Sequence, residues 1–549
     1  MLARCARLRR PSGGGPPAAA ARRALGTVLG RLSADGVEVD YLKEIVNARV
    51  YDVAQETALT PARRLSAELG CSVLIKREDT QPVFSFKIRG AYNKIVQLSE
   101  EERARGVVAC SAGNHAQGVA LSCRTLKTRG VIVMPLATPT IKVEAVAAHG
   151  GEFVDVRLHG NAYDDAAAEA TRLVVEEGLT LIHPFDDPKV IAGQGTIGAE
   201  IVKQLAGRRL DAIFCCCGGG GLAAGIAAFV KRVRPDVKVY AVEAEDSAGM
   251  KASLDAGERT ALTHVGLFAD GAAVKLVGRE TFRICHALLD GVVTVTNDEI
   301  CAAIKAGFSD TRIVLEPAGA LAIAGVRKYV SENHTGSDAD RKKQYVVISS
   351  GANMDFDRLR FVAERADRSE VRLAVKVPER PGAFRELYQT IFPCNVTEFS
   401  YRFNQHATAD IIVAFQPKTQ TWFQRLSTKG YEPRDITGDD LVKNHLRHLA
   451  GGHAPPGLNE RVLRFEFPEA PGALNRFLAA LQPDGDQTAA FNVSLFHYRN
   501  HGADFGRVLV GVQVPPGAES SKKFDDFLAN VGYRYVEETD NQNYRQFLG

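Results

Sequence analysis

Three short segments of this chain carry residue types that could perform chemistry together. A lysine, Lys87, lies in the run Ser85–Gly90. A polar segment follows at Ser111–His115, and four consecutive glycines occupy Gly218–Gly221. A lysine amine can form a Schiff base, polar side chains can hold a substrate, and bare backbone N–H groups can bind a phosphate. Pyridoxal phosphate requires these protein groups, so the sequence predicts an enzyme with this cofactor.

Lys87 must lose its proton near neutral pH to act as a Schiff-base nucleophile. Its neighbours Phe86 and Ile88 favour burial, and Arg89 is a second cation nearby. Both effects are expected to lower the pKa of the lysine. The alternative is an ordinary lysine at the start of a helix, which the hexapeptide alone does not exclude. The other two segments favour the catalytic interpretation.

The glycine run is followed by Leu222 and an apolar, helix-like stretch, so bare N–H groups and a helix N-terminus are expected at one spot. This arrangement suits a dianionic phosphate. A nucleotide site is the alternative, but the run has neither the GxGxxG spacing with a downstream acid nor a GK[ST] ending. The residues predicted to hold the cofactor phosphate are therefore Gly218, Gly219, Gly220, Gly221 and Leu222.

Two further polar residues each have a structural and a functional interpretation. Asn114 stands at the head of a predicted helix, so it could be the N-cap, or it could hydrogen-bond the cofactor; both roles can coexist. Ser350 follows a predicted strand, so it could be a turn serine, or its hydroxyl could face the pyridine nitrogen of the cofactor. A neutral hydroxyl there would leave the nitrogen largely unprotonated. The resulting weaker electron sink favours early loss of a β-hydroxyl.

The composition is that of an ordinary globular protein. Of the 549 residues, 45% are hydrophobic and 24% are charged, and the length predicts two or three domains. The net charge of +3 gives no indication of a nucleic-acid surface, and no apolar run reaches the roughly 20 residues that span a bilayer. The ten cysteines lack CxxC spacing, so we expect neither disulfides nor a metal site. Cys215, Cys216 and Cys217 are expected to be small buried side chains on a strand.

Short apolar runs alternate with longer amphipathic ones over residues 73–350. This alternation predicts an α/β fold with parallel sheets covered by helices. Ligands of such sheets bind beyond the carboxyl ends of the strands. The polar segment, the glycines and Ser350 follow strand-like runs at 106–110, 211–214 and 345–348. The candidate residues therefore come from places where strands end.

The last part of the chain contains a duplicated block. The run VPERPGAF at 377–384 is repeated as FPEAPGAL at 467–474, and NVTEFSYR at 395–402 is repeated as NVSLFHYR at 492–499. In each copy a strand is expected to lead through a Pro-Gly turn into a helix and a second strand, which gives two α+β modules. A Gly- and Pro-rich linker separates them, and the second copy has an insertion near 482–491 that should form a surface loop.

Residues 1–35 differ from the rest of the chain in composition. The first 34 residues contain seven arginines, no lysine and no acidic residue, with many Ala, Gly and Pro. This composition is typical of an organelle transit peptide, and a disordered N-terminal tail is the alternative. On composition alone, the low serine content favours a mitochondrial address.

Four motifs in this order and spacing resemble those of the fold-type II pyridoxal phosphate enzymes, and most closely those of the biosynthetic threonine dehydratases. They are SFKIRGA at 85–91, SAGNHAQG at 111–118, GGGGL at 218–222 and SSGAN at 349–353. The duplicated block resembles the paired ACT-like regulatory modules of that family. The likeness runs from about Val37 to Gly549 and is closest to plant and algal forms. It implies a catalytic domain at 36–365, modules at 371–449 and 461–549 joined by a linker at 450–460, and a homotetramer.

The resemblance also implies roles for residues of this chain. Lys87 would form the Schiff base and move protons in the dehydration of L-threonine to 2-oxobutanoate and ammonia, with L-serine as a secondary substrate. Cofactor contacts are implied for Phe86, Asn114, the glycine run with Leu222, and Ser350. Substrate contacts are implied for Ser111, Ala112, Gly113, Asn114 and His115.

For the duplicated block the resemblance implies isoleucine as a feedback inhibitor and valine as the opposing ligand. An arginine suits the carboxylate of such a ligand, whereas the alternative for a tyrosine beside an arginine is ordinary strand packing. Similarity to plant forms suggests the plastid as the compartment, with the mitochondrial matrix as the alternative. The candidate effector residues are Tyr401, Arg402, Arg447, Tyr498 and Arg499.

Two other functions are compatible with parts of the sequence. An unregulated serine/threonine dehydratase or a racemase would share the catalytic motifs, but the duplicated block argues against it. Racemases of this superfamily carry a serine just before Gly-Asn-His, where this chain has Ala112, although Ser111 is adjacent. An amino-acid sensor that has lost catalysis would keep the fold, but the intact Lys87, glycine run and Ser350 argue against this function.

Overall fold

The computed structural model describes most of the chain from residue 39 onward. The chain forms two compact units, one ending at Asn353 and the other beginning at Met354, and each is treated by itself below. The described residues are 39–366, 370–378, 383–391, 394–401, 408–417, 421–439, 441–442, 445, 459–468, 477, 480, 491–499 and 505–548.

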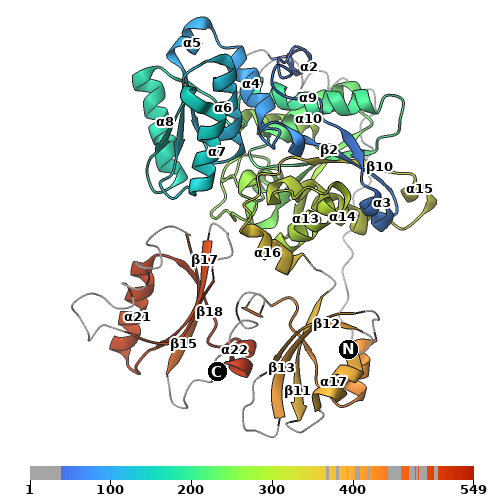
Figure 1. The fold of residues 1–549 in the computed structure, drawn as a ribbon, viewed down its shortest axis with the longest axis vertical. Coiled ribbons are helices and arrows are strands. Elements are labelled where there is room, and N and C mark those ends of the chain that lie inside the picture. Colours follow the sequence, from blue (N-terminus) through green and yellow to red (C-terminus); the bar gives the residue numbers. More distant parts are fainter. Residues whose placement is uncertain are drawn as a thin grey trace. The chain divides into compact units, whose positions relative to one another are not determined.

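The first unit contains a six-stranded sheet with the strand order β1-β2-β10-β7-β8-β9. Two of its neighbouring strands, β2 and β10, are labelled in Figure 1. All neighbouring strands in this sheet are parallel except β1 and β2. Every residue of β7 is buried, as expected for a parallel strand with helices on both faces. The strands are β1 (Leu59–Pro61), β2 (Ser72–Arg77), β7 (Ala212–Cys216), β8 (Lys238–Ala244), β9 (Gly291–Val295) and β10 (Gln344–Ser349).

Long helices pack on this sheet. Helix α14 contacts β7, β8, β9 and β10, while α10 contacts β7, β8 and the long helix α9. The start of α9 follows from sequence, because Asp187 caps the first N–H groups and Pro188 occupies the first turn. The helices are α2 (Tyr41–Val46), α3 (Arg63–Leu69), α9 (Pro188–Gln204), α10 (Gly221–Val233), α11 (Gly249–Ala256), α12 (Arg279–Leu288), α13 (Asn297–Thr311), α14 (Pro317–Asn333) and α15 (Asp338–Arg341).

A second sheet in the same unit is wholly parallel, with the order β5-β4-β3-β6. Helix α8 packs against β3 and β4, and α6 and α7 pack against β5. Helix α6 also contacts α4, which in turn contacts α9, so α4 connects the two layered parts. The elements are β3 (Val107–Cys110), β4 (Gly130–Met134), β5 (Val154–Leu158), β6 (Thr180–Leu181), α4 (Lys87–Val96), α5 (Glu100–Arg105), α6 (Asn114–Leu126), α7 (Thr140–Gly150) and α8 (Tyr163–Glu177). The predicted parallel α/β architecture is confirmed.

A buried ionic cluster fixes the position of α4. The guanidinium of Arg89 donates to both oxygens of Glu78 at 2.8 Å and to Glu200 at 2.6 Å, and Lys76 donates to the other oxygen of Glu200 at 2.6 Å. These four side chains are at most 2% exposed. Charges can be buried only when they are paired in this way, so the cluster ties α4 to the end of β2 and to α9.

The second unit contains two four-stranded antiparallel sheets built alike. Their orders are β12-β13-β11-β14 and β16-β17-β15-β18, and both carry a register shift at the same place, after Val396 and after Val493. The duplication seen in the sequence is therefore confirmed in the backbone. The strands are β11 (Val371–Pro378), β12 (Asn395–Tyr401), β13 (Thr408–Gln416), β14 (Arg434–Asp435), β15 (Glu460–Pro468), β16 (Asn492–Arg499), β17 (Phe505–Gln513) and β18 (Arg534–Glu537).

The helices of this unit are α16 (Arg358–Arg365), α17 (Ala383–Ile391), α18 (Trp422–Thr428), α21 (Ala518–Val531) and α22 (Gln542–Phe547). Helix α16 belongs to the second unit, although the sequence placed it in a catalytic domain ending at 365. Strand β15 begins at Glu460, the last residue of the predicted linker, and most of the predicted insertion lies outside the described residues.

The two sheets of the second unit share a hydrophobic core. Ala374 and Ile412 of the first sheet lie in one buried cluster with Val462 and Leu509 of the second, and Tyr544 of α22 completes it. A side-chain amide contact supports this packing, because Gln546 donates to Asp410 at 2.6 Å. The repeats are thus joined through their interiors as well as through the chain.

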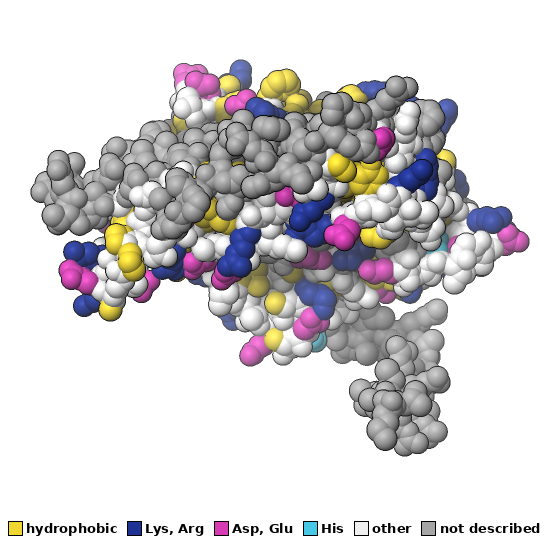
Figure 2. Space-filling view, turned by 90° about the horizontal axis from the view of Figure 1, so that it is seen from below, with side chains coloured by type: hydrophobic (Ala, Val, Ile, Leu, Met, Phe, Trp, Pro, Cys, Tyr) yellow, Lys and Arg dark blue, Asp and Glu magenta, His cyan; other side chains and the backbone are white. Residues whose placement is uncertain are grey.

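In the described part of the chain no helix is long and apolar enough to cross a membrane. On the face drawn in Figure 2, Lys and Arg side chains lie among Asp and Glu side chains rather than forming one broad area of a single sign.

We expect the ionic cluster around Arg89 to be essential for the stability of the first unit. Replacing Arg89 with Met leaves Glu78 without its bidentate partner and should lower the free energy of unfolding by about 3–5 kcal/mol. Denaturant unfolding measures this loss. The control is Arg172→Met, which removes exposed ion pairs to Glu169 and Glu176 and should leave the unfolding midpoint unchanged. Equal stability of the two variants would contradict the prediction.

Candidate active site

Backbone pairing brings Lys87 next to Ser350. The N–H of Phe86 donates to the carbonyl of Ser350 at 3.1 Å, and the N–H of Ala352 donates to the carbonyl of Phe84 at 2.8 Å. A β-bridge joins Ser85 to Gly351 between these bonds. The segment before α4 is therefore held along the segment that follows β10, at the carboxyl edge of the six-stranded sheet.

Lys87 is partly buried, and among the described residues no carboxylate forms an ion pair with its amine. Its Nζ donates to the carbonyl of Pro184 at 2.9 Å. Burial lowers the pKa of Lys87 to about 8, although Cys216 and Glu316 act in the opposite direction. The predicted effect of burial is confirmed. The predicted effect of Arg89 is wrong, because its guanidinium is engaged with Glu78 and Glu200 and is not among the causes of the shift.

Asn114 is not an N-cap. The N-cap of α6 is Gly113 and no side chain caps the helix, whereas Asn114 is its first residue. The side-chain amide of Asn114 donates to Glu316 at 2.6 Å and accepts from the amide of Asn353 at 2.6 Å. The polar segment after β3 is thereby fixed to the start of α14 and to the segment after β10.

Two other residues of the polar segment, His115 and Ser111, are held by contacts of their own. Nε2 of the buried His115 lies 2.8 Å from the carbonyl of Ile182, and burial together with the nearby Lys87 lowers the pKa of His115 to about 3. The imidazole is therefore neutral at physiological pH. The hydroxyl of Ser111 accepts from the N–H of Gly113 at 3.3 Å, which ties Ser111 to its own loop, and Ala112 lies between them.

The glycine run forms the turn between β7 and α10. Gly220 has φ of +97°, which favours glycine. A Cβ on Gly219 would lie 2.2 Å from the ring of Phe185, so no side chain fits there. The hydroxyl of Thr281 donates to the carbonyl of Gly219 at 2.6 Å and holds the turn. Phe185 directly follows Pro184, which accepts from Lys87, so the turn and the amine are neighbours.

These groups fit pyridoxal phosphate. The cofactor needs a neutral amine, a site for a dianionic phosphate and a partner for its ring nitrogen. Lys87 supplies the amine, bare N–H groups at the start of α10 suit the phosphate, and Ser350 is a buried hydroxyl beside them. Within the described part of the chain, the buried Ser85 Oγ and His115 Nδ1 have no hydrogen-bond partner, so polar groups are left over for ligands.

The sequence alone did not indicate four residues that help to form the site. Glu316 holds Asn114, Asn353 holds Asn114 from the other side, Pro184 accepts from Lys87, and Phe185 packs against the glycine turn. Along the chain, Glu316 lies 202 residues from Asn114, and Pro184 lies 97 residues from Lys87. The one available signal was Asn353, which is part of the SSGAN motif.

The described cysteines are free thiols. The nine cysteines that the structure describes are buried and none forms a disulfide. Among the described residues no group of three or more His, Cys, Asp and Glu side chains could hold a metal ion. The triple cysteine lies on β7 and in the turn after it, as predicted from its apolar context.

The predicted effector residues are described only in part. Tyr401 ends β12 opposite Ile411, and Tyr498 lies on β16 opposite Val508, so the two tyrosines occupy matching places in the two sheets. Arg499 follows Tyr498 on β16. Arg402 and Arg447 lie outside the described residues.

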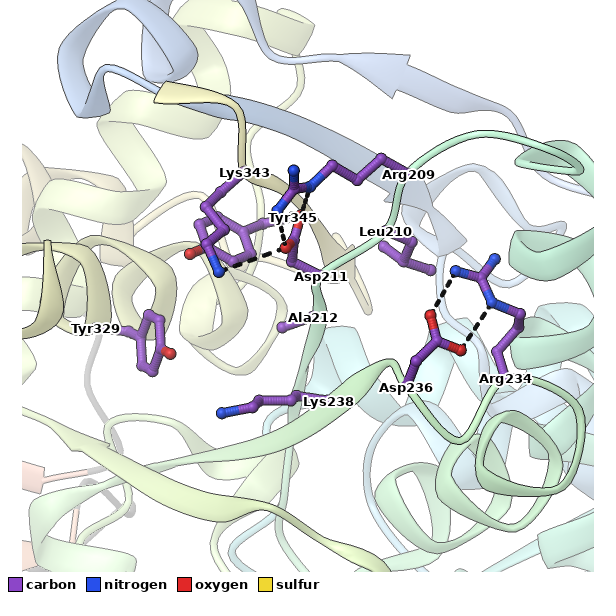
Figure 3. A pocket seen from close by; sticks show the side chains of 10 residues that line it. All are labelled: Arg209, Leu210, Asp211, Ala212, Arg234, Asp236, Lys238, Tyr329, Lys343 and Tyr345. Atoms are coloured by element: carbon purple, nitrogen blue, oxygen red, sulfur yellow. Dashed lines mark hydrogen bonds and ion pairs between the residues drawn. The ribbon is translucent and has the colours of Figure 1, made fainter. Parts of the chain in front are cut away.

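A surface cavity of about 390 Å³ lies away from this site (Figure 3). It opens where β7, β8 and β10 begin, and Ala212 and Lys238 line it. Asp211 pairs with Arg209 at 2.7 Å within it. Lys87 and the glycine turn lie where these parallel strands end, so the cavity is at the opposite edge of the sheet.

Comparison with known families agrees with this geometry. Residues 50–351 match the family model of pyridoxal-phosphate dependent enzymes. Residues 363–446 and 454–548 match the C-terminal regulatory domain of threonine dehydratase, once for each repeat.

Similar proteins share nearly the whole chain. The biosynthetic L-threonine dehydratase of Burkholderia multivorans is 53% identical over 93% of this chain and 99% of its own length. The mitochondrial threonine dehydratase of Saccharomyces cerevisiae is 47% identical over 93% and 89%, and the chloroplastic threonine dehydratase 1 of Solanum lycopersicum is 47% identical over 95% and 84%.

One solved structure extends the likeness to the fold. The processed form of threonine deaminase isoform 2 from Solanum lycopersicum superposes with a TM-score of 0.57 and 49% identity, covering 59% of this chain and 87% of that one. The motifs, the site geometry and both family models point the same way. The chain belongs to the biosynthetic threonine dehydratases, a family of pyridoxal-phosphate dependent enzymes with a C-terminal regulatory domain.

Proposed function

We propose that Lys87 is the catalytic residue for the dehydration and deamination of L-threonine to 2-oxobutanoate and ammonia, the committed step toward isoleucine. The environment of Lys87 carries the assignment: the residue is partly buried, desolvation lowers its pKa to about 8, and it lies beside both Ser350 and the glycine turn. L-Serine, which also has a β-hydroxyl, is a secondary substrate.

Different residues of the chain have different roles in the reaction. Bound pyridoxal phosphate supplies a ring that withdraws electrons from Cα of the amino acid. Lys87 binds the cofactor, takes the α-proton and returns a proton to the departing hydroxyl. Backbone N–H groups of the segment Ser111–His115 hold the substrate carboxylate, and Asn114 contacts the cofactor. Because Glu316 and Asn353 both bond the amide of Asn114, this segment keeps its position during the reaction.

The remaining cofactor contacts follow from where these residues lie in the fold. The N–H groups of Gly218–Gly221 and of Leu222, which all lie in the turn and first residues of α10, hold the phosphate. Phe86 precedes Lys87 and its ring lies 5.4 Å from the amine, so it lines the cofactor site. The hydroxyl of Ser350 meets the ring nitrogen.

A racemase of the same fold is the second candidate, and the polar segment disfavours it. Racemisation requires a proton donor on the face of Cα opposite the lysine. Ala112 offers no such group. The hydroxyl of Ser111 accepts from the N–H of Gly113, which holds this hydroxyl at its own loop. Dehydration needs only the lysine and therefore fits this site better.

We further propose that isoleucine and valine bind the duplicated block. The match of both repeats to a regulatory domain supports this, as do Tyr401 and Tyr498 at equivalent places of the two sheets. The charge that an amino-acid carboxylate requires comes from Arg402, Arg447 and Arg499.

We also propose an oligomeric state and a compartment for the protein. A homotetramer follows from the resemblance to the family. Residues 1–35 act as a transit peptide, because the first 34 of them are rich in arginine and free of acidic residues. The compartment is the plastid, in agreement with the chloroplastic relative, and the mitochondrial matrix is the alternative that the yeast relative represents.

Replacing Lys87 with Ala should abolish covalent binding of pyridoxal phosphate and lower formation of 2-oxobutanoate by at least about 10³-fold, because no other amine serves as base. Absorbance spectra and a 2-oxobutanoate assay measure the two effects. Lys94→Ala is the matched control on the same helix, since Lys94 pairs with Asp187 and should be dispensable for turnover. Turnover by Lys87→Ala would refute the role.

The lowered pKa of Lys87 should appear in cofactor uptake. Only the neutral amine attacks an aldehyde, so the rate at which the apoprotein takes up pyridoxal phosphate should rise from pH 7 and level off above about pH 9, with a midpoint near 8. Stopped-flow absorbance provides the rate. An ordinary exposed lysine would instead give a rate that still increases above pH 10.

Ending the chain after Ala366 should remove inhibition by isoleucine while some threonine turnover remains, because the first compact unit contains the whole candidate site. Release of 2-oxobutanoate with and without isoleucine tests this. In the full chain, Arg499→Cys should weaken the inhibition. Inhibition that persists in the shortened chain would place the effector site in the first unit, and an unchanged curve for Arg499→Cys would indicate strand packing.

A further inference from the structure

One thiol of the triple cysteine reaches into the candidate site. Strands β7 and β10 are parallel neighbours, with Val347 opposite Phe214, so both strands end at the same edge of the sheet. Sγ of Cys216, the last residue of β7, donates to Oγ of Ser350 at 3.3 Å. Cys216 is 7% and Ser350 2% exposed, so water does not compete for this bond.

The neighbouring cysteines do not share this contact. Sγ of Cys215 lies 3.7 Å from the carbonyl of Tyr240, and Sγ of Cys217 lies 3.7 Å from the carbonyl of Gly218. The difference follows from strand geometry, because successive side chains on β7 point to opposite faces of the sheet. Cys215 therefore provides a matched comparison for Cys216: the same residue type, on the same strand and equally buried.

The bond has a definite direction. Burial raises the pKa of the Cys216 thiol to about 11, so the thiol keeps its proton at neutral pH and acts as the donor. The hydroxyl of Ser350 in turn donates to the carbonyl of Ala318 at 3.3 Å. The oxygen of Ser350 thus accepts from sulfur. Its single proton makes only a long bond to Ala318, outside the ordinary range of O–H···O distances, so rotation about Cβ–Oγ can turn this proton to a bound ring nitrogen while Cys216 still donates to the oxygen.

This arrangement bears on the ring nitrogen that Ser350 is proposed to meet. A hydroxyl that already accepts a hydrogen bond is a better donor, because chained hydrogen bonds polarise one another. It also has one lone pair fewer with which to accept from a protonated ring nitrogen. Both effects favour a Ser350 that donates to an unprotonated nitrogen.

We infer that Cys216 is a positioning residue that orients the hydroxyl of Ser350 as a hydrogen-bond donor and thereby keeps the cofactor's ring nitrogen unprotonated. The inference rests on the proposed role of Ser350 in cofactor binding. It gives the triple cysteine a function at one position and leaves the other two as packing residues. A neutral nitrogen is a weaker electron sink, which suits the prompt loss of a β-hydroxyl rather than a long-lived carbanion.

The test compares the full-length, pyridoxal phosphate-loaded protein with four variants. Cys216→Ala and Cys216→Val remove the donor, the second while filling the volume. Cys216→Ser restores a donor, and Cys215→Ala is the control on the other face of β7. The readouts are the ¹⁵N chemical shift of ring-labelled cofactor, the Kd for pyridoxal phosphate, and kcat and KM for L-threonine.

Removing the donor should move the ¹⁵N shift toward the protonated form, raise the Kd by about threefold to tenfold, and lower kcat more than KM changes, since one hydrogen bond is lost. Cys216→Ser should recover most of the wild-type shift, and Cys215→Ala should match wild type. If both donor-free variants match wild type in ¹⁵N shift and Kd, Cys216 only fills space and the inference is wrong. Absence of cofactor from the wild-type protein would instead refute the proposed function.

Discussion

The incomplete solvation of the Lys87 amine is the constraint on which the rest of the site depends. In water a lysine keeps its proton until about pH 10.4, and it gives the proton up earlier only where the charged form is poorly solvated. Here the amine contacts a backbone carbonyl rather than a carboxylate, so its charge is only partly compensated. Two features maintain this burial: the pairing of Phe84–Phe86 with Ser350–Ala352, and the ionic cluster that holds α4 through Arg89.

The parallel strands of the two sheets of the first unit explain why so few residues suffice. Strands β3, β7 and β10 end at the segments that carry Asn114, the glycine turn and Ser350. Three stretches that are distant in sequence therefore contribute to one site directly from the ends of strands. The strands fix where these segments lie, and the turns after the strands carry the residues that contact ligands. Glycine is required where Phe185 and the turn approach each other, and the same bare backbone is what a phosphate needs. Packing and ligand binding thus favour the same residue type here.

The residue types of the site could be predicted from sequence, but the partners of those residues could not. Lys87, Asn114, the glycines and Ser350 were found because each follows a strand-like run or opens a helix. The prediction for Arg89 failed for a geometric reason: two residues along a helix correspond to a rotation of about 200°, so Arg89 points away from Lys87 and into the cluster with Glu78 and Glu200. Glu316 and Pro184 were missed because a tertiary contact across more than 90 residues leaves no local pattern.

The core shared by the two regulatory sheets couples their stabilities. Because Ala374, Ile412, Val462 and Leu509 are buried together, pulling the repeats apart would expose apolar side chains to water at a cost of roughly 25 cal/mol per Å². Duplicated modules often diverge into independent parts, but these two are thermodynamically one body. A substitution that loosens this shared cluster is therefore expected to destabilise both sheets.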